Sequence, residues 1–197
     1  KIGSGDIHNF EIIKKIVETK KPIIFSTGLS NFSDIKETLK FINSINKKYL
    51  KKKVAILYCN TAYPTPIQDI RLGTIKYLNN KFNLTTGYSD HTIGDEVLIY
   101  SYLFGAKIIE KHFSLNPKLK TFRDHQISFD KNATNKYLTK IRKLNNISNI
   151  KMNINLFYKF TEGKPLNFKW YSIEKEEKDF IPSFTKKIFQ KVSKVYL

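Results

Sequence analysis

The chain has 197 residues, with 35 Lys and Arg against 17 Asp and Glu, and a formal net charge of +18. Its residues are 41% hydrophobic and 14% aromatic, which is enough to bury a core, so a wholly disordered chain is excluded. The basic residues are overwhelmingly Lys, in tracts that are also rich in Asn and Ile. This pattern is typical of compositional drift, and it lowers the weight of the charge as a sign of a nucleic-acid partner.

No apolar run reaches membrane-spanning length, and the first residues lack the pattern of a signal peptide. The single Cys59 cannot form an intramolecular disulfide, which fits a reducing compartment. We therefore expect a cytoplasmic chain with neither a membrane nor a nucleic acid as its partner. The opening Lys-Ile-Gly-Ser-Gly resembles the end of a strand, which predicts a fragment of a longer protein.

Short apolar runs bounded by turn formers predict buried strands over 1–5, 22–26, 54–59, 84–88 and 107–113. Apolar residues at helical spacing predict amphipathic helices between and after them, over 12–17, 35–45, 67–78, 97–105 and 137–144. Ser33 is the predicted N-cap of the second helix, and Pro66 is the predicted start of the third.

Strand, loop and helix alternate along the chain, which indicates βαβ units and a parallel sheet. A complete (β/α)8 TIM barrel takes about 250 residues. The predicted fold is therefore α/β, an incomplete TIM barrel in which residues 1–147 supply the last five βα units. Residues 148–197 lose the pattern and are predicted to be an irregular tail or the remnant of a second domain.

Two His residues follow neighbouring predicted strands, His91 in Ser-Asp-His-Thr and His112 in Glu-Lys-His-Phe. Strands of a parallel sheet lie about 4.8 Å apart, so both imidazoles could reach one metal ion at the carboxyl edge. Asp90 and Glu110 could orient the two rings. Either His alone is more often the cap of a turn, but the repeated position favours a divalent ion such as Mn, Zn or Co.

Polar residues also mark other strand ends, where a small dianion would find a cation and hydroxyl donors. The residues concerned are Lys1, Ser4, Ser26 and Ser89. Each Ser taken alone is better explained by the needs of turns and N-caps.

The loop Tyr63-Pro64-Thr65-Pro66 is stiffened by its prolines and would hold the Tyr63 ring over the mouth of the site. Cys59 is predicted to be a small buried residue, because no base adjoins it in sequence. Asp124, in the loop after the last strand, could bind sugar hydroxyls or belong to a solvated turn.

Six blocks of sequence in order resemble the sialic acid synthase family, which makes N-acetylneuraminate, legionaminate and pseudaminate. They are Lys-Ile-Gly-Ser-Gly-Asp from residue 1, Lys-Pro-Ile-Ile-Phe-Ser-Thr-Gly from 21, Cys-Asn-Thr-Ala-Tyr-Pro-Thr-Pro from 59, Gly-Tyr-Ser-Asp-His-Thr from 87, Ile-Glu-Lys-His-Phe from 109 and Asp-His-Gln-Ile-Ser from 124. The resemblance runs from residue 1 to about residue 145.

The resemblance implies a TIM barrel that condenses phosphoenolpyruvate with the open-chain aldehyde of an N-acylated mannosamine-type sugar, releasing phosphate. It implies a metal, Mn or a similar ion, on His91 and His112, and a catalytic position for Glu110, which lines the same site. It also implies a homodimer for a full-length member.

The resemblance further implies which residues contact each substrate. Phosphoenolpyruvate would be bound by Lys1, Ser4, Ser26 and Ser89, and the sugar by Tyr63, Thr61 and Asp124. Thr61 stands where neuraminate-forming members carry Asn, so the sugar need not be N-acetylmannosamine itself. The family's catalytic Glu on the first barrel strand and a second Lys for phosphoenolpyruvate would lie upstream of Lys1, so we expect the chain alone to be incompetent in catalysis.

Three alternatives stay open at the level of sequence. The chain could belong to another phosphoenolpyruvate-dependent or aldol-type barrel acting on a different sugar. It could be a basic nucleic-acid-binding module, although the scattered Lys residues do not favour that class. It could also be a degenerate remnant without activity.

Overall fold

The structure is a computed structural model that describes residues 1–148, 156–158 and 169–171. The chain divides into two compact units, Lys1–Ile108 and Ile109–Leu197. Both are of the predicted α/β type, with helices and parallel strands.

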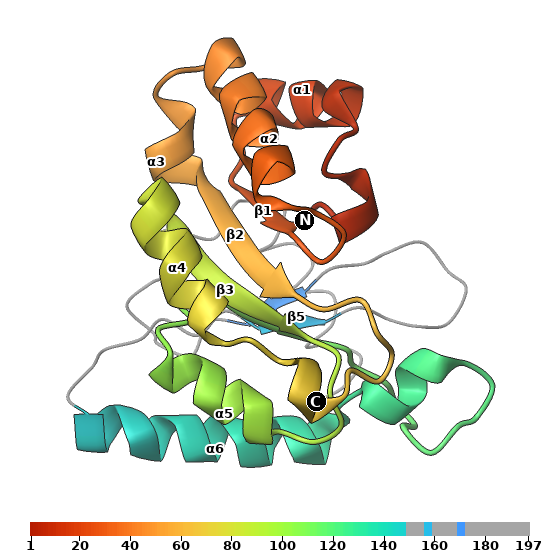
Figure 1. The fold of residues 1–197 in the computed structure, drawn as a ribbon. Helices are drawn as coiled ribbons and strands as arrows, with labels where there is room; N and C mark the ends of the chain where they lie inside the picture. Colours follow the sequence, from red (N-terminus) through yellow and green to blue (C-terminus); the bar gives the residue numbers. More distant parts are fainter. Residues whose placement is uncertain (149–155, 159–168, 172–197) are drawn as a thin grey trace. The chain divides into compact units, whose positions relative to one another are not determined.

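The first unit is built on three parallel strands, drawn side by side in Figure 1: β1 (Ile23–Ser26), β2 (Val54–Cys59) and β3 (Thr85–Asp90). Their register aligns Ser26 with Leu57 and Cys59 with Ser89. At one edge Ile2 forms a parallel bridge with Phe25. At the other, Lys107–Ile108 follow β3 through backbone hydrogen bonds of 2.8 Å. The predicted parallel arrangement is confirmed here.

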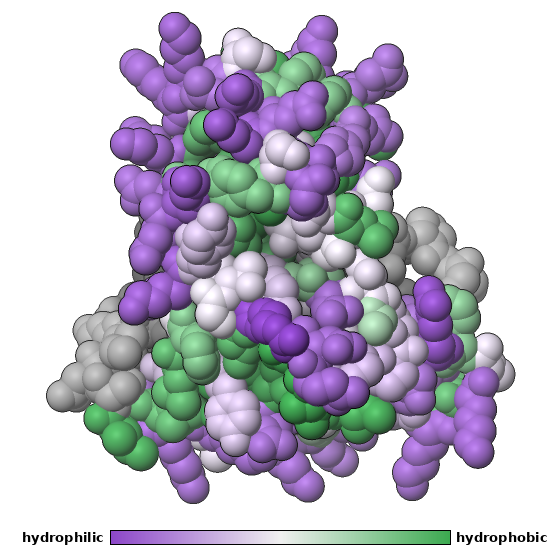
Figure 2. Space-filling view, in the orientation of Figure 1, coloured by the Kyte–Doolittle hydropathy of each residue, from purple (hydrophilic) through white to green (hydrophobic). Residues whose placement is uncertain are grey.

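Helices join and cover these strands (Figure 1). They are α1 (Phe10–Glu18), α2 (Phe32–Ile45), α3 (Tyr49–Lys53), α4 (Gly73–Phe82) and α5 (Glu96–Leu103), with short 3-10 helices at Ser4–Asp6 and Ile67–Asp69. Most of the predicted apolar stripes of α1 and α2 pack into one core with the strands, but Ile12 at the start of the first stripe is exposed. Hydrophilic side chains project around α1 to α3 in Figure 2, so much of the Lys charge lies on solvated helix faces.

Side chains of the strands alternate between two faces of the sheet. Phe25 and Ile56 belong to the core formed with the helices, as does Tyr58, whose ring stacks on Tyr88 at 5.6 Å. The strand residues that lie one position before or after these core residues therefore point to the opposite face of the sheet. These residues are Ser26, Leu57, Cys59 and Ser89.

The start of two helices differs from the prediction. The N-cap of α2 is Asn31, not Ser33, because the Asn31 side chain accepts from the backbone of Ser33 and Asp34 in a complete capping box. No single helix follows Pro66: a 3-10 turn is followed by extended backbone at Ile70, and α4 begins only at Gly73.

Strand bounds also differ from the prediction. Ile2 is the only residue of 1–5 that bridges a strand, because the chain turns into the 3-10 helix at Ser4. β3 runs to Asp90, two residues beyond the predicted end, although its last residues are polar.

The second unit contains β4 (Ile109–Lys111), a 3-10 helix (Arg123–Ile127) and α6 (Lys131–Ser148), followed by β5 (Leu156–Tyr158) and β6 (Lys169–Tyr171). β4 pairs with β5 in parallel, and β5 pairs with β6 antiparallel. The sequence predicted neither β5 nor β6. The predicted domain boundary at 147 and 148 stays a prediction. No helix in the described part of the chain is long and apolar enough to cross a membrane.

Candidate functional site

The predicted site residues of the first unit gather at the carboxyl edge of its strands. Ser26 ends β1, Cys59 ends β2, and Ser89 is the next-to-last residue of β3. In α/β folds this edge is where ligands bind, because the loops that leave the strands meet there. Ser26 and Ser89 are each 2% exposed, so these hydroxyls are held inside the edge and not in open turns.

At this edge, the Ser26 side chain is a buried polar group whose hydrogen bond is not made within the described residues. A buried polar group left without a partner costs about 1–3 kcal/mol, so such groups point to a ligand or water that completes them. Lys1 precedes Ile2, which bridges Phe25, so alternation places Lys1 on the same face as Ser26. The predicted anion site, which needs the exposed Lys1 ammonium to reach the buried Ser26 hydroxyl, stays a prediction.

Gly28, just beyond β1, lets three other segments approach one another. Its backbone N–H donates to the Ser4 hydroxyl at 3.0 Å. A Cβ at this position would lie 2.7 Å from Thr61 Cγ2, 3.1 Å from Ser4 Oγ and 3.2 Å from Cys59 Sγ. The structure thus brings Ser4 and Thr61 to one point, although they were predicted to contact different substrates.

His91 lies directly after β3, is 5% exposed, and has a partner at each ring nitrogen. Its Nδ1 is 2.5 Å from the Asn60 carbonyl oxygen, and its Nε2 is 2.9 Å from the Tyr63 hydroxyl. A carbonyl can only accept, so Nδ1 carries the proton, and in the neutral ring Nε2 then holds the lone pair. Cys59 Sγ lies 3.8 Å from Nδ1. Cys59 is buried as predicted, and the fold places beside its thiol the protonated Nδ1 of His91, a neighbour that closeness in sequence did not show.

The loop that carries Tyr63 is tied to the backbone at His91. Thr65 N donates to the His91 carbonyl oxygen at 2.9 Å, and Ala62 N donates to Asn60 Oδ1 at 2.9 Å. The Tyr63 ring stacks on the His91 ring, with centroids 4.0 Å apart and planes 27° apart. The structure thus places Tyr63 in direct contact with His91, and its position over the mouth of a binding site stays a prediction.

Asp90 was predicted to orient the His91 ring, but the ring is held by the hydrogen bond from its Nδ1 to the Asn60 carbonyl oxygen. The Asp90 carboxylate accepts from the Tyr88 hydroxyl at 3.0 Å and from Thr92 N at 2.9 Å. Burial, with the Asp90 carboxylate as the next cause, raises the pKa of Tyr88 well above its ordinary value, so Tyr88 is a neutral donor. Alternation explains the difference, since Asp90 lies on the face of Tyr88 and not on that of Ser89.

In the second unit, the His112 ring is paired with Asp124. His112 Nδ1 lies 3.3 Å from Asp124 Oδ2, and both side chains are buried. The segment is anchored by Phe129 N donating to the His112 carbonyl oxygen at 2.8 Å, and by Ser128 Oγ donating to the Asp124 carbonyl oxygen at 2.6 Å. Asp124 was predicted to bind sugar hydroxyls or to belong to a solvated turn; it is buried, and its closeness to His112 had no signal in the sequence. Glu110 is half-buried in β4, two residues before His112.

The donor chemistry of both His residues fits a divalent metal. A metal-binding His usually directs its second N–H to a carbonyl or carboxylate, which fixes the ring and its tautomer. His91 meets this condition through the Asn60 carbonyl oxygen, whereas His112 Nδ1 is near the Asp124 carboxylate but makes no hydrogen bond to a described residue. Within the described residues, no group of three or more His, Cys, Asp or Glu side chains is placed to hold a metal.

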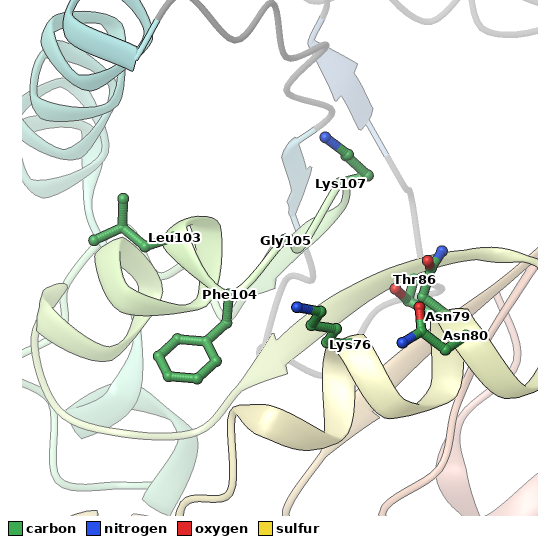
Figure 3. Close-up of a pocket in the computed structure, with 8 residues that line it drawn as sticks. All are labelled: Lys76, Asn79, Asn80, Thr86, Leu103, Phe104, Gly105 and Lys107. Carbon is green, nitrogen blue, oxygen red and sulfur yellow. The ribbon is translucent and has the colours of Figure 1, made fainter.

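A hollow of about 530 Å³ lies elsewhere in the first unit, between α4, β3 and the end of α5 (Figure 3). It is lined by Lys76, Asn79, Asn80, Thr86, Leu103, Phe104, Gly105 and Lys107. Thr86 lies near the start of β3, so the hollow is at the amino end of the strands. It is therefore distinct from the edge that carries Ser26, Ser89 and His91.

Parallel strands with polar residues and an oriented His at their carboxyl ends define an α/β protein with a candidate ligand site at that edge. The NeuB family profile matches residues 1–152, and the chain belongs to this family. The chain is 37% identical over 142 residues to an uncharacterized protein of Methanocaldococcus jannaschii, covering 72% of this chain and 41% of the relative. It is 35% identical over 144 residues to the N,N'-diacetyllegionaminic acid synthase of Campylobacter jejuni, covering 73% and 42%.

Among solved structures, the chain is similar to the N-acetylneuraminic acid synthetase of Leptospira borgpetersenii, determined in complex with citrate. The TM-score is 0.69 at 25% identity, over 84% of this chain and 53% of that one. The chain thus spans about two fifths of the length of the two curated relatives. The resemblance to sialic acid synthases stated from the sequence is confirmed.

Proposed function

We propose that the chain forms the last five βα units of a (β/α)8 barrel in an enzyme that makes a sialic-acid-like nonulosonic acid. In the reaction, C3 of phosphoenolpyruvate bonds to the aldehyde carbon of an N-acylated mannosamine-type sugar. Water adds at C2, and phosphate leaves by cleavage of the C–O bond. Sequence similarity to the legionaminic acid synthase supports the product class. A cytoplasmic homodimer with phosphoenolpyruvate and an N-acyl hexosamine as substrates belongs to the same proposal.

Each residue has a task in this reaction that follows from its chemistry. Lys1, Ser4, Ser26 and Ser89 would bind the carboxylate and phosphate of phosphoenolpyruvate by charge and hydrogen bonds. Tyr63, Thr61 and Asp124 would position the sugar, and Glu110 would move a proton at the reacting atoms. His91 and His112 would hold Mn²⁺, which when bound polarises the aldehyde oxygen as a Lewis acid.

The observation that carries the proposal is the way the two His residues are held. Nδ1 of His91 faces the Asn60 carbonyl oxygen, whereas Nδ1 of His112 lies 3.3 Å from Asp124 Oδ2 without forming a hydrogen bond to a described residue. The hydrogen bond at Nδ1 prepares Nε2 of His91 as a metal ligand, and Asp124 is close enough to His112 to do the same after a small rotation of either side chain. The buried Ser26 hydroxyl, without a partner among the described residues, adds the need for a polar ligand at the carboxyl edge of the first unit, where His91 also lies.

The test is an assay of phosphate release by the protein that carries this sequence, in its natural length. Phosphoenolpyruvate and Mn²⁺ are supplied with a panel of N-acylated hexosamines and, separately, with other aldoses. We expect release with at least one N-acyl hexosamine and its loss in His91→Ala and His112→Ala. Release with other aldoses alone would assign the chain to a different phosphoenolpyruvate-dependent barrel. No release with any sugar would refute the proposal.

A further inference from the structure

The Nε2 atom that the proposed function gives to a metal is already engaged by the Tyr63 hydroxyl, at 2.9 Å. We propose that Tyr63 caps His91 in the metal-free protein and must release it before a metal binds. Tyr63 is then a positioning residue that sets metal affinity at this site. The inference rests on the proposed function, since it concerns the metal site of that same reaction.

The Tyr63 hydroxyl and a metal ion cannot bind His91 Nε2 at the same time, because of the direction of the hydrogen bond between Tyr63 and His91. Because Nδ1 of His91 faces the Asn60 carbonyl oxygen, Nε2 holds the only lone pair of the ring. Tyr63 Oη must therefore donate its proton to Nε2. A divalent ion needs that same lone pair, so Tyr63 and the metal cannot both use it.

Stacking strengthens the cap. The Tyr63 ring lies over the His91 ring at 4.0 Å, nearly parallel to it, and His91 is 5% exposed. Aromatic pairs in this arrangement gain energy beyond the area that they bury. The capped state thus has two attractive contacts between the same two side chains, and a metal must compete with the one at Nε2.

The loop backbone stays in place when the cap opens. Thr65 N is bonded to the His91 carbonyl oxygen, Thr65 Oγ1 to the Ala62 carbonyl oxygen, and Ala62 N to Asn60 Oδ1. These bonds fix both sides of Tyr63 to the strand ends. Release of Nε2 is therefore a rotation of the Tyr63 side chain, after which its hydroxyl is available to a substrate.

Calorimetric titration with Mn²⁺ alone, without substrates, tests the proposal. Tyr63→Phe keeps the stacked ring and removes only the competing hydroxyl, so we expect it to bind Mn²⁺ about 2- to 10-fold more tightly than the parent. Tyr77→Phe is the matched control, because Tyr77 is exposed on α4, and its affinity should equal that of the parent. A merely structural role of Tyr63 would weaken binding or leave it unchanged.

A second measurement needs no metal. In the ¹⁵N spectrum of the metal-free protein, Tyr63→Phe should move the His91 Nε2 resonance toward that of an acceptor without a hydrogen bond, and leave the Nδ1 resonance in place. An unmoved Nε2 resonance, or equal or weaker Mn²⁺ binding by Tyr63→Phe, would overturn the cap. If the parent and all variants fail to bind Mn²⁺ while the Nε2 resonance shifts as expected, the cap exists, but the metal site of the proposed function and the competition fall together.

Discussion

Replacing Gly28 by Ala tests whether the site is as closely packed as its distances indicate. The added Cβ would stand 2.7 Å from Thr61 Cγ2 and within 3.2 Å of Ser4 Oγ and Cys59 Sγ. Overpacking of this kind costs about 1–3 kcal/mol, because side chains or backbone must shift to make room. Gly28→Ala should therefore lower the free energy of unfolding by about that amount.

Urea denaturation followed by circular dichroism measures this difference, and two further variants locate its cause. Gly73→Ala is the control, since a Cβ there has no heavy atom within 4 Å, and its stability should not fall. Adding Thr61→Ser to Gly28→Ala removes the nearest contact and should restore roughly 0.5 kcal/mol or more. A Gly28→Ala variant as stable as the parent would refute the packing assigned to this point.

Three further predictions concern single side chains. Asn31→Ala removes the capping box of α2 and should lower the free energy of unfolding by about 1 kcal/mol in urea titration. The pKa of Tyr88 is raised in the folded state, so its contribution to stability is complete below the unfolded pKa of 10.0 and is lost as the pH rises beyond that value. Tyr88→Phe should therefore make the fall of the urea midpoint above pH 10.0 less steep than in the parent. An equally steep fall in the variant would contradict the assignment. Asp124→Asn weakens the acceptor at His112 Nδ1 and should reduce Mn²⁺ affinity about 10- to 100-fold by calorimetry, whereas unchanged affinity would remove Asp124 from the support of His112.

The strands and helices of the first unit were predictable because their signal is local. Apolar runs such as Val54–Cys59 and stripes such as Ile35, Leu39 and Ile42 reflect burial against neighbours at regular spacing, and all of these residues except the half-buried Tyr58 are buried. The start of α4 was not predictable in this way. Arg71 N is held by the Tyr58 hydroxyl at 2.9 Å, a contact with β2 across the fold that no local pattern shows.

The same distinction applies to the candidate site. His91 and His112 could be selected from their position after strands, a feature of local sequence. Their partners could not, since Tyr63 is 28 residues from His91 and Asp124 comes from a separate 3-10 helix. Asp90 was given the wrong task because its closeness to His91 in sequence conceals that alternate residues of a strand face opposite ways.

The fate of one oxygen atom tests the proposed reaction most directly. Phosphoenolpyruvate labelled with ¹⁸O in the C–O–P bridge is turned over with Mn²⁺ and the accepted N-acyl hexosamine by the protein that carries this sequence in its natural length. Cleavage of the C–O bond predicts that the label leaves in phosphate and that the new carbonyl oxygen comes from water. Unlabelled phosphate, or no phosphate at all, would contradict the proposed condensation.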